Sequence, residues 1–401
     1  MSAALDAYAS FRSRDFRLLL TGNFLANFGL QMLSVAVSWD LYMQTRSAVV
    51  LGNVGFVQVA PFLLFALFAG HVADRYDRRR VMLVTQVLLL AASALLAFAS
   101  RSVALIYTCL FLMQMARALQ GPARQAMVPE IVPLDVLSNA IAWHTSAFEI
   151  ASVTGPALAG ILVAAAGSRA VYLIQVACAG LTLGCVWMMR YRGEGKRDHA
   201  TREGRSLLEG LRFVWRSRLV LPAISLDLFA VLFGGATALL PIFAVDILHA
   251  GARGLGWLRA ASSIGAILMA FLQAHAGPIR RSGLALLWSV AGFGAATVVF
   301  GFSRSLWLSF VMLMAIGALD NVSVVLRQSL VQKKTPDAVR GRVLAVNSIF
   351  ISCSNQLGAV ESGWTAAWFG AVPSVVGGGL ATVLIVAAFA VGSRELRGWT
   401  E

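Results

Sequence analysis

Charged residues are scarce in this sequence, and acidic residues are scarcer than basic ones. Only 13% of the 401 residues are charged, and 58% are hydrophobic. Soluble domains are about one-quarter charged and about half apolar, so this composition excludes a soluble protein. A net charge of +14 would suggest nucleic-acid binding in a soluble chain, but here the basic residues lie in short segments between apolar runs. We therefore expect a lipid bilayer as partner, and no nucleic acid.

Cysteines and catalytic motifs are also few. The four cysteines lie within apolar runs, without a CxxC pair or a histidine cluster, so they are expected to pack between helices and no metal site is predicted. The chain has no P-loop, no HExxH and no Gly-x-Ser-x-Gly. We therefore expect neither an enzyme nor a cofactor. Because the chain has no nucleotide-binding motif, we expect an ion gradient or simple facilitation to drive its function. As the coupling ion, the proton is favoured over sodium.

Long apolar runs are abundant. A bilayer core needs about 20 apolar residues per helix. Twelve such helices are predicted to start near Phe16, Val49, Val81, Val103, Leu137, Ala170, Leu219, Leu255, Leu284, Leu306, Val343 and Pro373. Of the 33 lysines and arginines, 26 fall in the predicted inner loops and ends, including Arg124 and Arg327, and six fall on the outer side. This excess predicts an inner-membrane protein with both termini in the cytoplasm.

The chain reads as two related halves. A polar segment at 191–218 separates six predicted helices at 1–190 from six at 219–401, and its apolar and basic residues predict a short interfacial helix. A shift of 203 residues gives eight identities in 37 positions, among them Arg124-Gln125 with Arg327-Gln328, and a shift of 204 matches Leu51-Gly52 with Leu255-Gly256. The sequence therefore predicts an all-α integral membrane fold of two pseudo-symmetric six-helix bundles, with a substrate site near the midplane.

A glycine and charge motif follows the second predicted helix. The run Gly70-His71-Val72-Ala73-Asp74-Arg75-Tyr76-Asp77-Arg78-Arg79-Arg80 resembles the signature loop of the major facilitator superfamily, with Asp77 in place of a glycine. The resemblance implies an inner gate formed by Gly70, Asp74, Arg75, Arg78 and Arg79. The alternative is an ordinary basic cytoplasmic loop.

Two further motifs resemble the same superfamily. Arg117 to Gly121 resembles its Arg-x-x-Gln-Gly motif, which is linked with proton coupling, and the shift of 203 residues places Asp320 at the position equivalent to Arg117. We expect this pair to face one cavity, and the alternative is that Arg117 reaches the cytoplasmic surface. Gly155, Pro156 and Gly160 resemble the Gly-Pro motif of the superfamily's antiporters and predict a helix that rocks against a neighbour.

Buried acids and polar stripes supply the remaining site candidates. Glu149, Asp227 and Asp320 lie within predicted helices and are candidate proton carriers with Arg117 as charge partner, and a structural hydrogen-bonding role is the alternative for Glu149. The first helix carries a polar stripe that predicts a watery cavity, with helix-to-helix hydrogen bonding as the alternative. Asp40 and Asp246 are expected near the outer surface, in contact with water. The predicted cavity residues are Asn23, Asn27, Gln31, Trp143, Phe148 and Asn347.

The motifs and the duplication together identify the sequence as similar to the major facilitator superfamily over nearly its whole length. The run Ser206 to Phe213 and the run Thr335 to Arg342 are similar to its enterobactin exporter branch, which includes siderophore and drug effluxers. The resemblance implies proton-driven export of a small amphiphilic compound by alternating access. An importer, a lipid or lysolipid flippase, and a membrane interaction protein that has lost transport remain alternatives. The sequence is compatible with a monomer.

Overall fold

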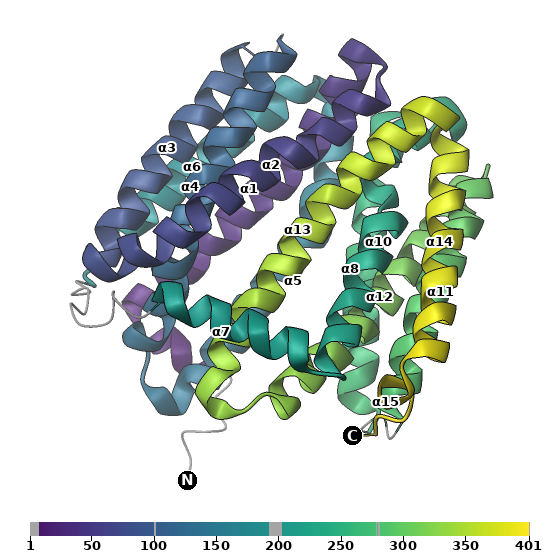
Figure 1. Cartoon of the computed structure of the whole chain (residues 1–401). Coiled ribbons are helices and arrows are strands. Elements are labelled where there is room, and N and C mark those ends of the chain that lie inside the picture. Colours follow the sequence, from purple (N-terminus) through teal and green to yellow (C-terminus); the bar gives the residue numbers. More distant parts are fainter. Residues whose placement is uncertain (1–7, 100–101, 192–202, 278, 280, 401) are drawn as a thin grey trace. The chain divides into compact units, whose positions relative to one another are not determined.

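A computed structural model of the chain describes residues 8–99, 102–191, 203–277, 279 and 281–400, without the side chains of 66–68, 70, 71, 73, 74, 99, 203–208 and 338. In this part of the chain the secondary structure is helical and no strand is present. Twelve of its helical spans are long and apolar enough to cross a membrane. The predicted all-α membrane fold and the predicted number of spans are therefore confirmed (Figure 1).

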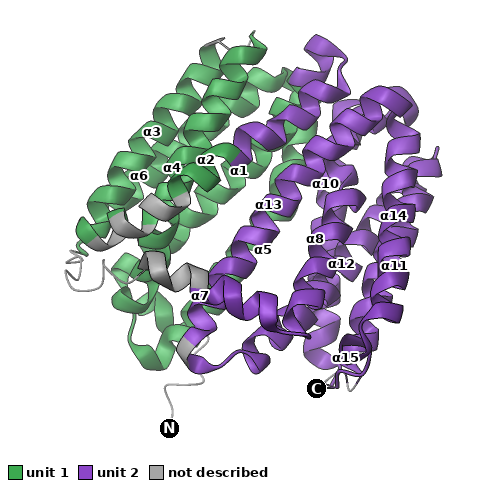
Figure 2. Cartoon of the chain, in the orientation of Figure 1, with its two compact units in different colours: residues 1–40, 60–201 green, residues 41–59, 202–401 purple. Residues whose placement is uncertain are grey.

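The helices gather into two compact units, which Figure 2 draws in separate colours. Unit 1 consists of Met1–Asp40 and Ala60–Thr201, and unit 2 consists of Leu41–Val59 and Arg202–Glu401. The segment Leu41–Val59 thus belongs to unit 2, although it lies in the first half of the sequence. The domain ranges derived from the sequence stay a prediction.

Unit 1 is built from long helices and two short helical turns. They are η2 (Ala9–Arg12), α1 (Arg14–Thr45) up to Asp40, α2 (Ala48–Arg75) from Ala60, α3 (Arg78–Ala99), α4 (Val103–Ile131), η3 (Leu134–Val136), α5 (Leu137–Ala166) and α6 (Ser168–Met188). Helix α3 packs against both α4 and α6. Buried Leu19, Met82, Met127 and Val186 join α1, α3, α4 and α6 in one apolar cluster. The burial of such side chains holds these helices at fixed positions within the unit.

Unit 2 contains the second set of spans. They are α8 (Val220–Gly234), η4 (Ala236–Leu239), α9 (Leu240–Ile242), η5 (Phe243–Ile247), α10 (Gly251–His275), α11 (Ser282–Phe302), α12 (Leu306–Lys334), α13 (Asp337–Phe369), α14 (Ala371–Gly392) and α15 (Arg394–Arg397). Elements α8 to η5 form one apolar span that is interrupted after Gly234. Glycines bring α10 and α12 together, because a Cβ on Gly265 or Gly317 would collide with the facing backbone at Met314 or Ser262.

Helices α4 and α12 are longer than the sequence analysis expects. Each has 29 residues, or about 44 Å at 1.5 Å per residue, against a bilayer core of about 30 Å. Arg124 therefore lies inside α4 and Arg327 inside α12. The sequence analysis counts both arginines among the inner loops and ends, and the structure shows that they lie within helices that are longer than a bilayer core requires.

A further helix, α7 (Glu203–Arg216), occupies the region between the two sets of spans. Val214 is buried in the apolar core of unit 2 together with Val343 of α13, whereas Trp215 is 70% exposed. The carboxylate of Glu209 also forms an ion pair with Arg342 of α13. One face of α7 is therefore fixed to unit 2, and its contact with the membrane interface stays a prediction.

Candidate functional site

A buried ion pair joins two helices of unit 2. Asp227 of α8 is 5% exposed and Arg327 of α12 is 1% exposed, and their side chains are in direct contact. Removing a charge from water costs several kcal/mol unless a partner compensates it. Asp227 is thus held by a cation that the sequence analysis assigned to a loop. Its predicted role as a proton carrier stays untested, but the structure gives it a fixed partner.

Asp320 lies on α12, two turns before Arg327. Ser323 lies on the same helix, one turn before Arg327. Asp227, Asp320 and Ser323 line one cavity of about 10 Å³ together with Phe293 of α11. That volume is enough for about one water molecule. The hydroxyl of Ser323 is buried and has no hydrogen-bond partner among the described residues. The site therefore offers polar groups to a small occupant.

The charges of this cluster do not balance. Asp227 and Asp320 supply two carboxylates, and Arg327 supplies one guanidinium. Within the described chain, Asp320 makes neither an ion pair nor a side-chain hydrogen bond. In apolar surroundings an unpaired carboxylate is costly, and a proton is the smallest group that neutralises it. The cluster is thus one positive charge short when both acids are ionised.

A second polar cavity lies between α2 and α4 in unit 1. It has a volume of about 300 Å³, and its charged lining residues are Arg117 and Arg124, with Gln114 and Gln125 beside them. Both guanidiniums lack an ion pair and a hydrogen bond within the part of the chain that the structure describes. Arg117 therefore lines a cavity of unit 1, whereas Asp320 lines the cavity of unit 2, and their predicted pairing stays a prediction.

The polar stripe of α1 is bonded to α5. The Asn23 amide lies 3.0 Å from Nε2 of His144, and the Gln31 amide donates to Oγ of Ser152 at 3.0 Å. Asn27 is buried and donates to the carbonyl of Asn23 at 2.8 Å. The bonds of Asn23 and Gln31 are those of the helix-to-helix alternative, whereas the bond of Asn27 stays within α1. The lining of a watery cavity by Asn23, Asn27 and Gln31 stays a prediction.

The other predicted cavity residues occupy different environments. Trp143 stacks on Tyr8 with ring centroids 5.7 Å apart and also contacts Phe11 edge-on, so it packs in the apolar cluster of unit 1. Phe148 is 43% exposed, and Asn347 is 4% exposed with an Oδ1 that has no hydrogen-bond partner among the described residues. Substrate binding by these three residues stays a prediction.

Glu149 is partly buried on α5. Within the described residues its carboxylate has no ion pair and no side-chain hydrogen bond. It therefore stays a candidate proton carrier beside Asp320.

The small-residue face of α5 packs directly on α1. Gly155, Pro156 and Gly160 are all buried. A Cβ added to Gly155 would lie 2.8 Å from Cβ of Gln31 and 3.1 Å from the carbonyl oxygen of Phe28. Only glycine fits this contact. The close approach of α5 to α1 is thus present, and the predicted rocking motion stays a prediction.

The basic loop between α2 and α3 ties the ends of several helices in unit 1. Arg78 pairs with Glu130 of α4, and Arg79 donates to the carbonyl of Val186 on α6 at 3.2 Å. Oδ1 of Asp77 accepts hydrogen bonds from the backbone amides of Arg79 and Arg80 and so caps α3. This cap explains why aspartate can replace the glycine of the signature loop.

The same carboxylate of Glu130 accepts a hydrogen bond from the Tyr191 hydroxyl. Burial and this bond raise the pKa of Tyr191 to about 12, so the hydroxyl stays protonated and continues to donate. Of the predicted inner gate, Arg75 is exposed, while the side chains of Gly70 and Asp74 lie outside the described residues. The gating role of all five residues stays a prediction.

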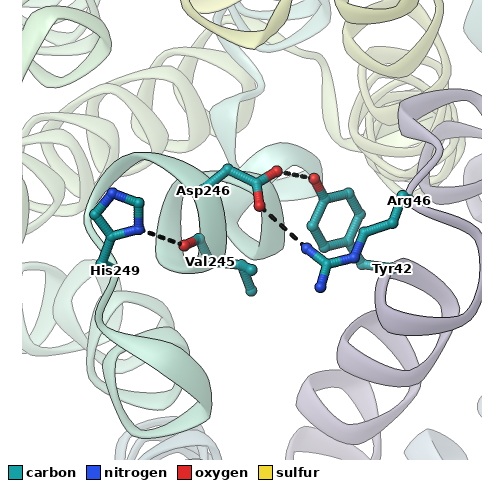
Figure 3. A network of polar contacts seen from close by, with 5 residues as sticks. All are labelled: Tyr42, Arg46, Val245, Asp246 and His249. Atoms are coloured by element: carbon teal, nitrogen blue, oxygen red, sulfur yellow. Dashed lines mark hydrogen bonds and ion pairs between the residues drawn. The ribbon is translucent and has the colours of Figure 1, made fainter.

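Asp40 and Asp246, which the sequence analysis places near the outer surface, have protein partners. Asp40 accepts hydrogen bonds from Ser168 at 2.5 Å and Tyr172 at 2.6 Å. Figure 3 shows that Tyr42 and Arg46 both point toward Asp246, which accepts a hydrogen bond from Tyr42 and pairs with Arg46 at 3.1 Å. The expectation that both acids simply meet water is wrong, because neighbouring donors satisfy them.

Backbone strain surrounds the Asp246 network. Arg46 and His249 have positive φ values of 51° and 49°, which non-glycine residues seldom adopt. Residues Phe243–Ile247, which include Asp246, form a π-helical turn. Such turns are uncommon and frequently occur at functional sites. The network thus holds the segment Leu41–Val59 to the rest of unit 2. It lies at the end of that unit's helices opposite α7.

Comparison with known proteins decides the family. The family model described as transmembrane secretion effector matches residues 5–401, which is nearly the whole chain. The chain belongs to the transmembrane secretion effector family of the major facilitator superfamily. As a member of this family it is a multi-pass membrane transporter of small molecules and not an enzyme.

Curated relatives of this secretion effector include export proteins. The multidrug efflux pump Tap of Mycobacterium tuberculosis is 26% identical over 363 residues, which cover 86% of this chain and 85% of Tap. The enterobactin exporter EntS of Shigella boydii is 27% identical over 390 residues, covering 95% of this chain and 92% of EntS. The predicted resemblance to the enterobactin exporter and drug efflux branch is confirmed.

Solved structures share the fold. A bacterial homologue of the human lysosomal transporter Spinster, solved in an inward-facing and occupied conformation, has a TM-score of 0.75 and 14% sequence identity. The match covers 98% of each chain. This likeness supports the twelve-helix architecture of the secretion effector and nothing more specific.

Sequence reasoning missed the charged partner of Asp227 and the second arginine of the unit 1 cavity. The signal was available in the duplication, because Arg124-Gln125 and Arg327-Gln328 are equivalent pairs. A basic residue that recurs at equivalent places of two halves indicates a shared helical position. The Tyr42, Arg46 and Asp246 network gave no comparable signal, because it joins residues about 200 positions apart.

Proposed function

We propose that this secretion effector is a proton-coupled exporter of small amphiphilic organic compounds of the siderophore or drug-like class, working by alternating access. It lies in the inner membrane with both termini in the cytoplasm, acts as a monomer, binds no nucleic acid and uses the proton gradient in place of a cofactor. The export activities of Tap and EntS support the direction of transport. The excess of basic residues in the predicted inner loops supports the orientation.

The charge imbalance at Asp227, Asp320 and Arg327 is the observation that carries the coupling. With Asp320 protonated, Asp227 and Arg327 remain as a neutral pair. Loss of that proton leaves one net negative charge beside an apolar wall that includes Val290 and Phe293. The charged form is costly there and favours a conformation in which Asp320 meets water. Protonation of Asp320 can thus bias one conformation over another.

The Asp246 network supplies the contact that must break. Alternating access requires the two ends of the transport path to open in turn. Tyr42 and Arg46 attach the end of α1 to Asp246, and Asn53 of α2 accepts a hydrogen bond from Trp364 of α13 at 3.2 Å. Opening of this end would release these contacts, while the strained backbone at Arg46 and His249 would relax.

Transport in proteoliposomes tests the proposal. Uptake of enterobactin would be measured with and without an imposed pH gradient, for the wild type, Asp320→Asn and the control Asp337→Asn. Asp337 is an exposed residue whose ion pair with Arg340 lies at the start of α13. We expect gradient-driven uptake in the wild type and control, and its loss in Asp320→Asn. Equal uptake with and without the pH gradient in every variant would contradict proton coupling.

A further inference from the structure

The cavity between α2 and α4 carries positive charge that the chain does not neutralise. Arg117 and Arg124 lie two turns apart on one face of α4, and the two charges act on each other. In the described part of the chain, neither guanidinium forms an ion pair or a hydrogen bond. We propose that this pocket binds an acidic group of the transported compound, so that the substrates are amphiphilic anions. The inference rests on the proposed export function and adds the substrate class.

The first step of the argument is the cost of the two arginines. A single arginine at the centre of a membrane helix costs about 2.5–3.5 kcal/mol on insertion scales, and a like charge nearby adds to it. In this protein the described acids of unit 1 near helix ends are engaged elsewhere. Asp40 bonds to Ser168 and Tyr172, and Glu130 bonds to Arg78 and Tyr191. No described acid pairs with Arg117 or Arg124, and a bound acidic group would supply the compensating charge.

The second step compares the equivalent positions of the two halves. The shift of 203 residues pairs Arg124 with Arg327, and the shift of 204 pairs Asn23 with Asp227. Arg327 has its carboxylate in Asp227. At the equivalent place in unit 1, Asn23 is neutral and is bonded to His144. Arg124 thus occupies the place of a paired arginine from which the pairing acid is missing.

The third step concerns the shape and chemistry of the pocket. Its volume of about 300 Å³ suits a small organic molecule, and Phe62, Ala69, Ala118 and Pro122 provide apolar walls beside the two arginines. Guanidinium groups bind carboxylates through paired hydrogen bonds. An aromatic or aliphatic body with one acidic group therefore matches both parts of the lining. A cation would meet two like charges and is disfavoured.

Binding of acids and their neutral amides tests this inference directly. Benzoate, naphthalene carboxylate and biphenyl carboxylate would each be compared with the corresponding amide, by calorimetry on the full chain in a neutral maltoside detergent. We expect the wild type to bind at least one acid about tenfold or more tightly than its amide. We expect Arg117→Gln and Arg124→Gln to lose that preference and Arg124→Lys to keep part of it. Arg169→Gln is the control, because Arg169 lies over the ring of Phe98, away from this pocket.

Asn23→Asp supplies a variant that keeps both arginines. It places a carboxylate at the position equivalent to Asp227, so it should compete with the bound acid and weaken acid binding about tenfold, with amide binding unchanged. Equal binding of acids and amides by the wild type, or no binding of any acid, would overturn the inference. Acid-selective binding without gradient-driven transport would keep the anion site and contradict the export proposal. Gradient-driven transport with equal affinity for acid and amide would keep the export proposal and contradict the anion site.

Discussion

At the scale of single residues, the side chains of Asp227 and Arg327 show how much one partner matters inside a membrane protein. Both are buried and they contact each other across α8 and α12. Either charge alone would destabilise the protein, because the free-energy cost of its desolvation exceeds the stabilisation that the surrounding apolar residues provide. The pair also leaves Asp320 as the acid without a cation. The proposal that Asp320 carries the proton thus rests on the pairing of its neighbour Asp227 with Arg327.

The ion pair gives the first prediction. Arg327→Met leaves Asp227 as an unpaired buried acid and should destabilise the protein by about 3–5 kcal/mol. The double variant Arg327→Met with Asp227→Leu removes both charges and should recover most of that loss. The midpoint of thermal unfolding in detergent measures both effects. A double variant as unstable as Arg327→Met would show that the ion pair is not what the single change breaks.

At the scale of elements, the packing of α5 on α1 depends on a position without a side chain. A Cβ on Gly155 would lie within 2.8 Å of Gln31. The hydrogen bond from Gln31 to Ser152 is made across the same interface. Close backbone approach and side-chain bonding therefore act together, which is the usual way that membrane helices associate.

The second prediction concerns this interface. Gly155→Leu should force α5 away from α1 and destabilise the protein by about 1–3 kcal/mol, as overpacking of a core does. Gly184→Leu on α6 is the matched control, because a Cβ there meets nothing within 4 Å. The unfolding midpoint of each variant measures the effect. Equal midpoints for the two variants would contradict a tight contact at Gly155.

The third prediction concerns the segment Leu41–Val59. Asp246→Asn removes the charge that pairs with Arg46 and weakens the bond from Tyr42, so the contact of this segment with η5 should open more often. Maleimide labelling of Leu41→Cys, a buried position of this segment, in a chain whose four native cysteines are replaced by alanine, measures this opening. We expect faster labelling with Asp246→Asn than with Asp246 intact. An unchanged rate would show that the network does not restrain this end.

Sequence analysis predicted the elements better than their contacts. Apolar runs fix the membrane spans because the bilayer demands about 20 apolar residues in each, and all twelve are present. The analysis did not foresee that α4 and α12 extend far enough to include Arg124 and Arg327. Hydropathy reports how apolar a segment is and does not mark where a helix continues beyond the length that a bilayer requires. The break of the seventh span after Gly234 was missed for the same reason.

At the scale of the whole molecule, the two halves carry related helices with different charges. At equivalent positions the first half holds Arg117, Arg124 and the neutral Asn23, and the second half holds Asp320, Arg327 and Asp227. At these three positions the first half therefore carries a surplus of positive charge and the second half a surplus of negative charge. We interpret this divergence as a difference in function, in which the first half binds an acidic group of the substrate and the second half binds a proton. The duplication predicted both sets of positions, but only the structure shows which charges are paired.

Proton release on addition of substrate to the purified protein tests whether substrate binding is coupled to the proton on Asp320. Enterobactin and naphthalene carboxylate would be added to the wild type, Asp320→Asn and Glu149→Gln in weakly buffered detergent solution, with a pH indicator dye as readout. We expect substrate binding to release protons from the wild type and from Glu149→Gln, and we expect Asp320→Asn to release none. Measurable substrate binding without proton release from the wild type, or undiminished release from Asp320→Asn, would contradict it.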